Sequence, residues 1–204
     1  ADIWLSAYSV FYPTPYENLH ILPAHARRLQ DIELVRKQDV YDQVVHRLRE
    51  FLTLPGIVDD YDLVIIDTRP SKGPLVQAAM HAATHLLIPS EMEPPSVEGL
   101  HGMLSVRTQV NLHRPKSDPL RLIGILPNKF RAGVRIHDEY LSILSQDTDI
   151  GKYMLPVVLN DWVGYKASML FGSDSLFRSS TDDKHQIQLK QVCSAIFDRM
   201  EAAQ

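Results

Sequence analysis

Residues 61–71 of the chain read Tyr61-Asp62-Leu63-Val64-Ile65-Ile66-Asp67-Thr68-Arg69-Pro70-Ser71, and they indicate the class of fold. Leu63 to Ile66 form an unbroken apolar run, which is typical of a strand buried on both faces of a parallel sheet. Asp67 follows directly and places a carboxylate at the strand's carboxyl end, the edge at which open α/β sheets bind ligands. An aspartate here also serves as a turn or helix-cap residue, so the carboxylate alone leaves both interpretations open.

Strand-like and helix-like segments alternate on both sides of this run. Apolar runs predict strands at 19–22, 63–66, 85–88, 120–126 and 153–159, and helical periodicity predicts helices at 24–53 (in two pieces), 74–83, 97–112, 137–146, 164–170 and 184–202. Such alternation favours right-handed crossovers and an α/β fold with a mostly parallel sheet and helices on both faces. No linker interrupts the pattern, so we expect residues 1–204 to form a single α/β domain.

Composition excludes several classes of protein. With 45% hydrophobic and 23% charged residues, the chain is not of the disordered class. Its one cysteine, Cys193, excludes internal disulfides and clusters that need several thiolates. No apolar run reaches the roughly 18–20 residues of a membrane span and no signal peptide is visible, so we expect a cytoplasmic protein without a membrane partner.

The segment at 61–71 resembles the Walker B and switch region of the ParA and MinD group of deviant Walker ATPases, whose usual text is near "YDYVIIDTPPS". Further segments resemble the same family in the same order: Leu19–Ala24, Thr84–Pro89, Glu91–Leu100, Ile123–Phe130 and Arg131–Glu139. The chain is therefore similar to ParA-like partition ATPases. This resemblance implies a P-loop NTPase-like fold of the ParA/MinD type.

The resemblance also implies site residues and cofactors. Asp67 would be the catalytic carboxylate that holds Mg²⁺ through water, and Thr68 and Pro70 would belong to the nucleotide-sensing switch. Asn128 would hydrogen-bond the adenine edge of ATP or ADP, although an Asx turn after a strand also explains an asparagine there. Arg69 replaces one of the two prolines that follow Asp-Thr in the family text, which is a departure within the switch.

The phosphate-binding loop of the family, KGGxGK[ST], is absent from this sequence. Of the nine glycines only Gly151 precedes a lysine, and the residues around it do not fit the motif. In the family this loop lies upstream of the segment that resembles residues 19–24, and the sequence does not begin with Met. We therefore expect an N-terminally truncated ParA-like chain that alone neither hydrolyses ATP nor binds it tightly.

Positive charge concentrates in one segment although the net charge is −4. The segment from Leu100 to His137 contains seven Lys or Arg residues and one acidic residue, Asp118, so its net charge is +6. One interpretation is a surface that binds DNA phosphates without sequence preference. The other is an ordinary mixed surface. For the first interpretation the candidate residues are Arg131, Arg135, Lys166 and Arg178.

The resemblance implies an ATPase acting in plasmid or chromosome partitioning. Such a protein would form an ATP-dependent homodimer, bind non-specific DNA at the nucleoid, and be stimulated by a ParB-like centromere-binding protein. One alternative is a MinD-like membrane-cycling ATPase, but residues 184–204 carry only +1 where that class has a basic amphipathic helix. The other alternative is a nucleotide-free interaction module on the same fold.

Overall fold

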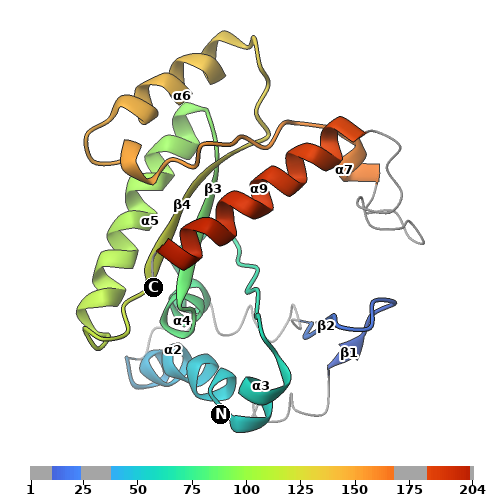
Figure 1. Cartoon of the computed structure of the whole chain (residues 1–204). Coiled ribbons are helices and arrows are strands. Elements are labelled where there is room, and N and C mark those ends of the chain that lie inside the picture. Colours follow the sequence, from blue (N-terminus) through green and yellow to red (C-terminus); the bar gives the residue numbers. More distant parts are fainter. Residues whose placement is uncertain (1–10, 24–37, 168–182, 203–204) are drawn as a thin grey trace. The chain divides into compact units, whose positions relative to one another are not determined.

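A computed structural model of the chain describes residues 11–23, 38–167 and 183–202 (Figure 1). Contacts between residues group the chain into two compact units. The first unit contains residues 1–84 and 105–120, and the second contains residues 85–104 and 121–204. Each unit has a cluster of buried apolar side chains of its own.

In the described residues of the first unit, a small hairpin is followed by helices. Strands β1 (Tyr12–Pro13) and β2 (His20–Ile21) pair antiparallel. Helices α2 (Gln38–Leu52), α3 (Pro55–Asp60) and α4 (Pro74–Ala82) follow. Leu48 and Phe51 of α2 are buried against Ala78 and Ala79 of α4, whose small side chains admit the larger ones. Burial of apolar surface is the main term that stabilises this pair of helices.

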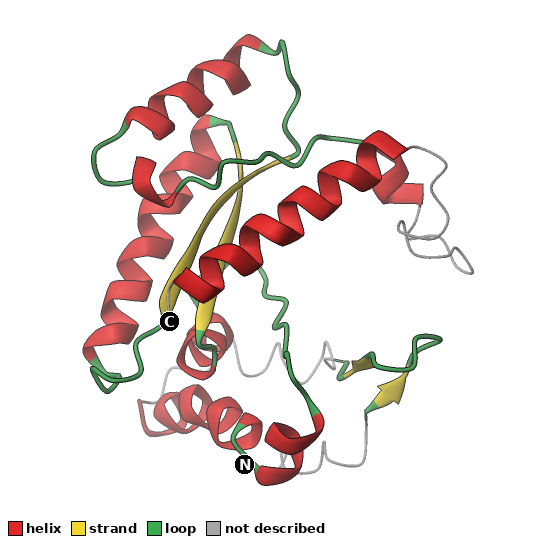
Figure 2. Ribbon diagram, in the orientation of Figure 1, coloured by secondary structure: helices red, strands yellow, loops and turns green. Residues whose placement is uncertain are grey.

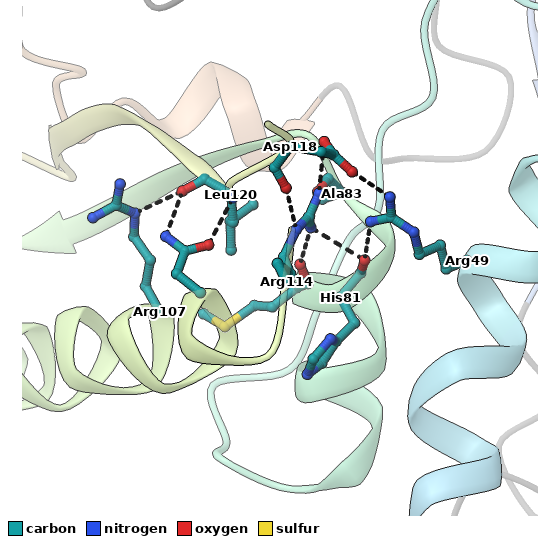
Figure 3. A network of polar contacts seen from close by, with 9 residues as sticks. Arg49, His81, Ala83, Arg107, Arg114, Asp118 and Leu120 are labelled. Carbon is teal, nitrogen blue, oxygen red and sulfur yellow. Dashed lines mark hydrogen bonds and ion pairs between the residues drawn. The ribbon is translucent and has the colours of Figure 1, made fainter. Parts of the chain in front are cut away.

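Arg114 closes the carboxyl end of α4 (Figure 3). Its side chain is 2% exposed, and Nη1 donates to the carbonyl oxygens of Met80 at 3.0 Å, His81 at 3.1 Å and Ala83 at 2.7 Å. The last carbonyls of a helix have no partner within the helix, so this side chain supplies the donors that they lack. Arg114 is therefore a structural residue of the first unit.

Asp118 completes this polar cluster. It pairs with Arg114 and also with Arg49 of α2, which donates to the His81 carbonyl as well. Burial opposes the ionisation of Asp118, but the hydrogen bond from Arg49 and the charge of Arg114 outweigh it and lower the pKa of this carboxyl. The cluster holds α2, α4 and the 113–120 loop together with charged groups that satisfy one another.

The second unit contains a parallel pair of strands and the longer helices (Figures 1 and 2). Strand β3 (His85–Glu91) pairs parallel with β4 (Arg121–Asn128). Between and after them lie α5 (Pro94–Leu112), α6 (Arg135–Gln146), the short 3-10 helix η2 (Gly151–Tyr153), α7 (Val163–Ala167) and α9 (Asp183–Ala202). Helix α5 contributes residues to both units.

Helices cover both faces of the β3–β4 pair. Ile88 and Ile125 pack in one cluster with Leu100 of α5 and Leu144 of α6. Their neighbours along the strands point the other way, where Leu126 packs with Val192 of α9. Successive strand side chains alternate between faces, and this alternation produces the two clusters. The predicted parallel sheet with helices on both faces is thus present in this unit.

The segment at 153–159 differs from its predicted strand. Its first residue belongs to η2, and the residues after it form an extended chain with one isolated bridge between Ile125 and Met154. Leu155 N–H still donates to the Ile125 carbonyl at 2.9 Å, and Leu159 N–H donates to the Pro127 carbonyl at 2.8 Å. The segment therefore runs along the edge of β4 without forming a continuous ladder.

The predicted buried strand at 63–66 is wrong for this structure. The segment is extended, but it pairs with no other strand among the described residues. Ile65 is 83% exposed, and Leu63 and Val64 are about half exposed. A strand buried on both faces needs neighbours along both edges and helices above and below, and only Ile66 packs against the first unit's core.

Most predicted helices are confirmed, with shifts at their ends. Helices α4, α6 and α9 match the predicted ranges within two residues, whereas α5 begins three residues earlier than predicted, at Pro94. The first piece of the helix predicted at 24–53 falls largely outside the described residues, as do residues 168–170.

Candidate functional site

The carboxyl ends of β3 and β4 form the candidate site in the second unit. Glu91 ends β3, Asn128 ends β4, and the two residues are register partners in the parallel pair. Because β3 and β4 run the same way, the side chains that come after them gather at one edge. Most of these side chains are charged.

The chain turns sharply just after β4. Lys129 has a φ of 48°, in the left-handed region that side chains other than glycine rarely adopt. Its N–H donates to Asn128 Oδ1 at 2.9 Å, and its ammonium pairs with Glu91. The hydrogen bond with Glu91 and the charge of that carboxylate raise the pKa of Lys129. The turn thus places Lys129 where its ion pair with Glu91 links the ends of the two strands.

His137 holds the next part of this loop. The ring is buried, and Nδ1 accepts the N–H of Arg131 at 3.1 Å. Because Nδ1 accepts, the proton of the neutral ring lies on Nε2, which is 3.4 Å from Glu93 Oε1. The ring also packs beside Phe130, at 5.7 Å between ring centroids. His137 therefore joins the start of α6 to both the loop and the residues after β3.

Both candidate arginines in this loop are paired with carboxylates. Arg131 donates through Nε to Asp161 Oδ2 at 2.7 Å, and its Nη2 contacts the same oxygen. Arg135, the first residue of α6, donates to Glu139 one turn later at 2.7 Å. The two arginine side chains are 65% and 90% exposed, so both are accessible to solvent.

These ion pairs reduce the local positive charge expected of residues 100–137, whose net charge along the sequence is +6. Arg114 is buried at α4, while Lys129, Arg131 and Arg135 are paired with Glu91, Asp161 and Glu139. All three of these carboxylates lie outside residues 100–137 in the sequence. Charge counted along a window therefore overstates the local positive charge of the folded loop.

Asp67, Thr68 and Pro70 belong to the first unit. They lie on the exposed, extended stretch between α3 and α4, where Ser71 N–H donates to the Arg69 carbonyl at 2.8 Å. A single exposed carboxylate next to a hydroxyl fits a Mg²⁺ ion that keeps most of its water and takes its other ligands from phosphate. Among the described residues no three His, Cys, Asp or Glu side chains are grouped closely enough to hold a metal. The sequence has no Gly-rich loop to fit a triphosphate.

The second unit brings three of the predicted site residues together. Asn128, Arg131 and Arg135 follow one another at the end of β4, in the second unit. Asp67 is in the first unit, so the predicted nucleotide residues are divided between the two units. Lys166 lies in α7, and Arg178 lies outside the described residues. The Asn128 side chain makes a local contact with Lys129, the kind of role that the Asx-turn alternative predicts.

Four residues of this site had no predicted role: Glu91, Glu93, His137 and Asp161. The predicted strand ended at Ile88, whereas β3 runs on to Glu91, so the rule that placed Asp67 at a strand end would have found Glu91 only with the observed end of the strand. Asp161 is 30 residues from Arg131 and carries no motif. It reaches the site because Phe130 and Asn160 form a parallel bridge, which no local pattern shows.

Comparisons with known proteins give the context of these residues. A family model described as "AAA domain" matches residues 5–118. The chain is 33% identical over 132 residues to "Protein IncC" of Escherichia coli, covering 64% of this chain and 34% of that protein. It is 34% identical over 113 residues to "Chromosome-partitioning ATPase Soj" of Thermus thermophilus, covering 55% and 40%. The chain thus spans less than half the length of these relatives.

Solved structures are similar over nearly the whole chain. The ATP complex of Cyanothece McdA superposes with a TM-score of 0.76 at 15% identity, covering 96% of this chain and 74% of that one. Cobyrinic acid a,c-diamide synthase from Mycobacterium smegmatis with bound ADP and magnesium gives 0.67 at 20% identity, covering 100% and 72%. These likenesses confirm the predicted α/β fold. No helix among residues 11–23, 38–167 and 183–202 is long and apolar enough to cross a membrane.

Proposed function

We propose, from the premise that this chain belongs to the AAA domain family and to the ParA-like partition ATPases within it, that it forms part of an ATP-dependent switch for plasmid or chromosome partitioning. The family match carries the proposal, because residues 5–118 include the Asp67 segment. In the working protein, ATP would drive homodimerisation, the dimer would hold nucleoid DNA, and a ParB-like partner would stimulate hydrolysis.

The nucleotide roles are assigned to two groups of residues. Asp67 would orient a magnesium-bound water, with Thr68 and Pro70 in the same switch. Asn128 would present its amide to the adenine edge, since Nδ2 keeps two donors while Oδ1 binds Lys129 N–H. Bound Mg·ATP supplies the phosphoryl group and the charge that positions water. The residues of this chain would bind and orient these groups.

The DNA-binding role is assigned to Arg131 and Arg135, with Lys166 and Arg178 as further candidates. Arg131 and Arg135 both lie in the loop and helix start after β4, and both guanidinium groups are largely exposed. Arginine reaches phosphate oxygens with several donors at once, which suits backbone contacts without sequence preference. Each contact that neutralises a phosphate makes the affinity fall with rising salt.

Duplex binding by variants of a nucleotide-competent form of this protein, in the presence of ATP and Mg²⁺, tests this role. We expect Arg131→Ala with Arg135→Ala to weaken binding of a short duplex at low salt and to reduce the slope of log K against log[salt] by about 2. Lys190→Ala, which removes an exposed charge from α9, is the matched control and should leave the slope nearly unchanged. Equal affinity of the wild type and the double variant for several unrelated duplexes would contradict the assignment.

A further inference from the structure

Arg131 is held at two places by residues that no motif predicted. Its backbone N–H is fixed by His137, and its guanidinium donates twice to a single oxygen of Asp161. Asp161 is itself fixed, because its N–H donates to the Phe130 carbonyl at 2.9 Å and Phe130 N–H donates to the Leu159 carbonyl at 3.0 Å. The carboxylate therefore stands beside Arg131 before any ligand arrives.

We propose that Asp161 competes with DNA phosphates for Arg131 and so sets the affinity of the loop for DNA. This inference rests on the proposed DNA-binding function and adds the residue that restrains it. For Arg131 to give its Nε and Nη2 donors to a phosphate, the guanidinium must leave the carboxylate. The free energy of the Arg131–Asp161 pair is then subtracted from the free energy of binding DNA.

The two arginines differ in how firmly they are restrained. The side chain of Asp161 is only 20% exposed and its backbone is hydrogen-bonded in place, so forming this pair requires the ordering of Arg131 alone. Arg135 and Glu139 are 90% and 53% exposed and lie one turn apart on α6. Exposed pairs of that kind contribute little, because water screens them and two mobile side chains must be ordered. The restraint therefore acts on Arg131 and hardly on Arg135.

Matched variants separate this restraint from a simple change of charge. Asp161→Asn and Glu139→Gln each remove one negative charge beside a candidate arginine. We expect Asp161→Asn to tighten duplex binding roughly two- to fivefold at low salt, the range given by the strength of single ion pairs, and Glu139→Gln to tighten it less. In an Arg131→Ala background the gain from Asp161→Asn should shrink to that of Glu139→Gln.

The outcomes distinguish the two proposals. If Arg131→Ala weakens binding but Asp161→Asn leaves the affinity unchanged, or tightens it equally in both backgrounds, the restraint is refuted and the DNA-binding function stands. If the nucleotide-competent, ATP-bound wild type binds no duplex, or the arginine variants bind as the wild type does, both proposals fail.

A measurement on the unaltered protein covers the case in which Asp161→Asn does not fold. The ¹H–¹⁵N resonance of Arg131 Nε reports directly on its acceptor. Titration with duplex should shift this resonance as a phosphate replaces the carboxylate, while the Arg107 Nε resonance stays in place, because that group donates to the Leu120 carbonyl. An Arg131 Nε resonance that does not move at saturating duplex would overturn the proposal.

Discussion

His81 illustrates how a single residue is changed by its surroundings. Its side chain is buried at the carboxyl end of α4, with the ring of His46 edge-on at 5.3 Å between centroids. Burial is the main cause that lowers the pKa of His81 to about 4, and the charges of His46 and Arg114 act in the same direction. The folded protein therefore keeps this ring neutral at pH values where a free histidine is protonated.

This shift predicts an acid-dependent loss of stability. Below the unfolded pKa of about 6.5 the unfolded chain binds a proton that the folded chain does not, down to about pH 4. The free energy of unfolding should therefore fall as pH falls through this window, by up to about 3 kcal/mol from His81. Urea unfolding at several pH values measures it. The substitution His81→Gln should flatten the dependence of the unfolding free energy on pH, whereas the control His101→Asn, at an exposed position, should not. Parallel pH profiles for the wild type and His81→Gln would refute the prediction.

At the scale of elements, β4 carries a position that admits no side chain. A Cβ on Gly124 would lie 2.7 Å from the Tyr153 carbonyl oxygen and 3.0 Å from Leu155 Cδ2. The ladder with β3 shifts register here, since Leu86 pairs with Leu122 while Leu87 pairs with Gly124. The glycine lets the 153–155 segment approach the strand closely.

We expect Gly124→Ala to destabilise the protein by about 1–3 kcal/mol, the usual cost of forcing extra atoms into a packed site. Gly99→Ala is the matched control, because a Cβ there meets nothing within 4 Å in the interior of α5. That variant should stabilise by about 0.5–1 kcal/mol, since alanine favours helix over glycine. Chemical denaturation measures both, and equal stabilities of the two variants would show that the close approach is absent.

The local sequence pattern predicted the helices well, because the spacing of apolar side chains within a helix determines which of its faces packs against the core. In α9 the spacing of Val192 and Ile196 directs one face toward the strands, and both residues pack there. The same reasoning failed at Leu63–Ile66, because burial of a strand depends on neighbours that a local pattern does not reveal. It also missed Asp161, which a bridge between distant segments brings to Arg131.

At the scale of the whole molecule, the residues predicted to bind nucleotide belong to two compact units. Asp67 and Asn128 belong to different compact units, and the sequence contains no phosphate-binding loop. The resemblance predicted these residues by motif, and their joint role in one site stays a prediction. The expectation that residues 1–204 form one domain likewise stays a prediction.

The absence of a phosphate-binding loop from this sequence predicts weak binding of nucleotide. Backbone N–H groups of a Gly-rich loop make most of the phosphate contacts in P-loop proteins, so a chain without them loses most of the affinity for ATP. We expect titration calorimetry of the 204-residue chain with ATP and Mg²⁺ to show no submicromolar binding. A full-length ParA-like relative serves as the positive control, and tight, saturable binding by this chain would contradict the expectation.

The open run from Leu63 to Ile65 has a consequence for handling the polypeptide. Its peptide groups meet no ladder partner in the described parts of the chain, and its side chains present an apolar surface to water. An unpaired extended segment can form strand hydrogen bonds with a second molecule. High protein concentration therefore favours aggregation. A low protein concentration, or the substitution Ile65→Lys, would reduce this aggregation in solution.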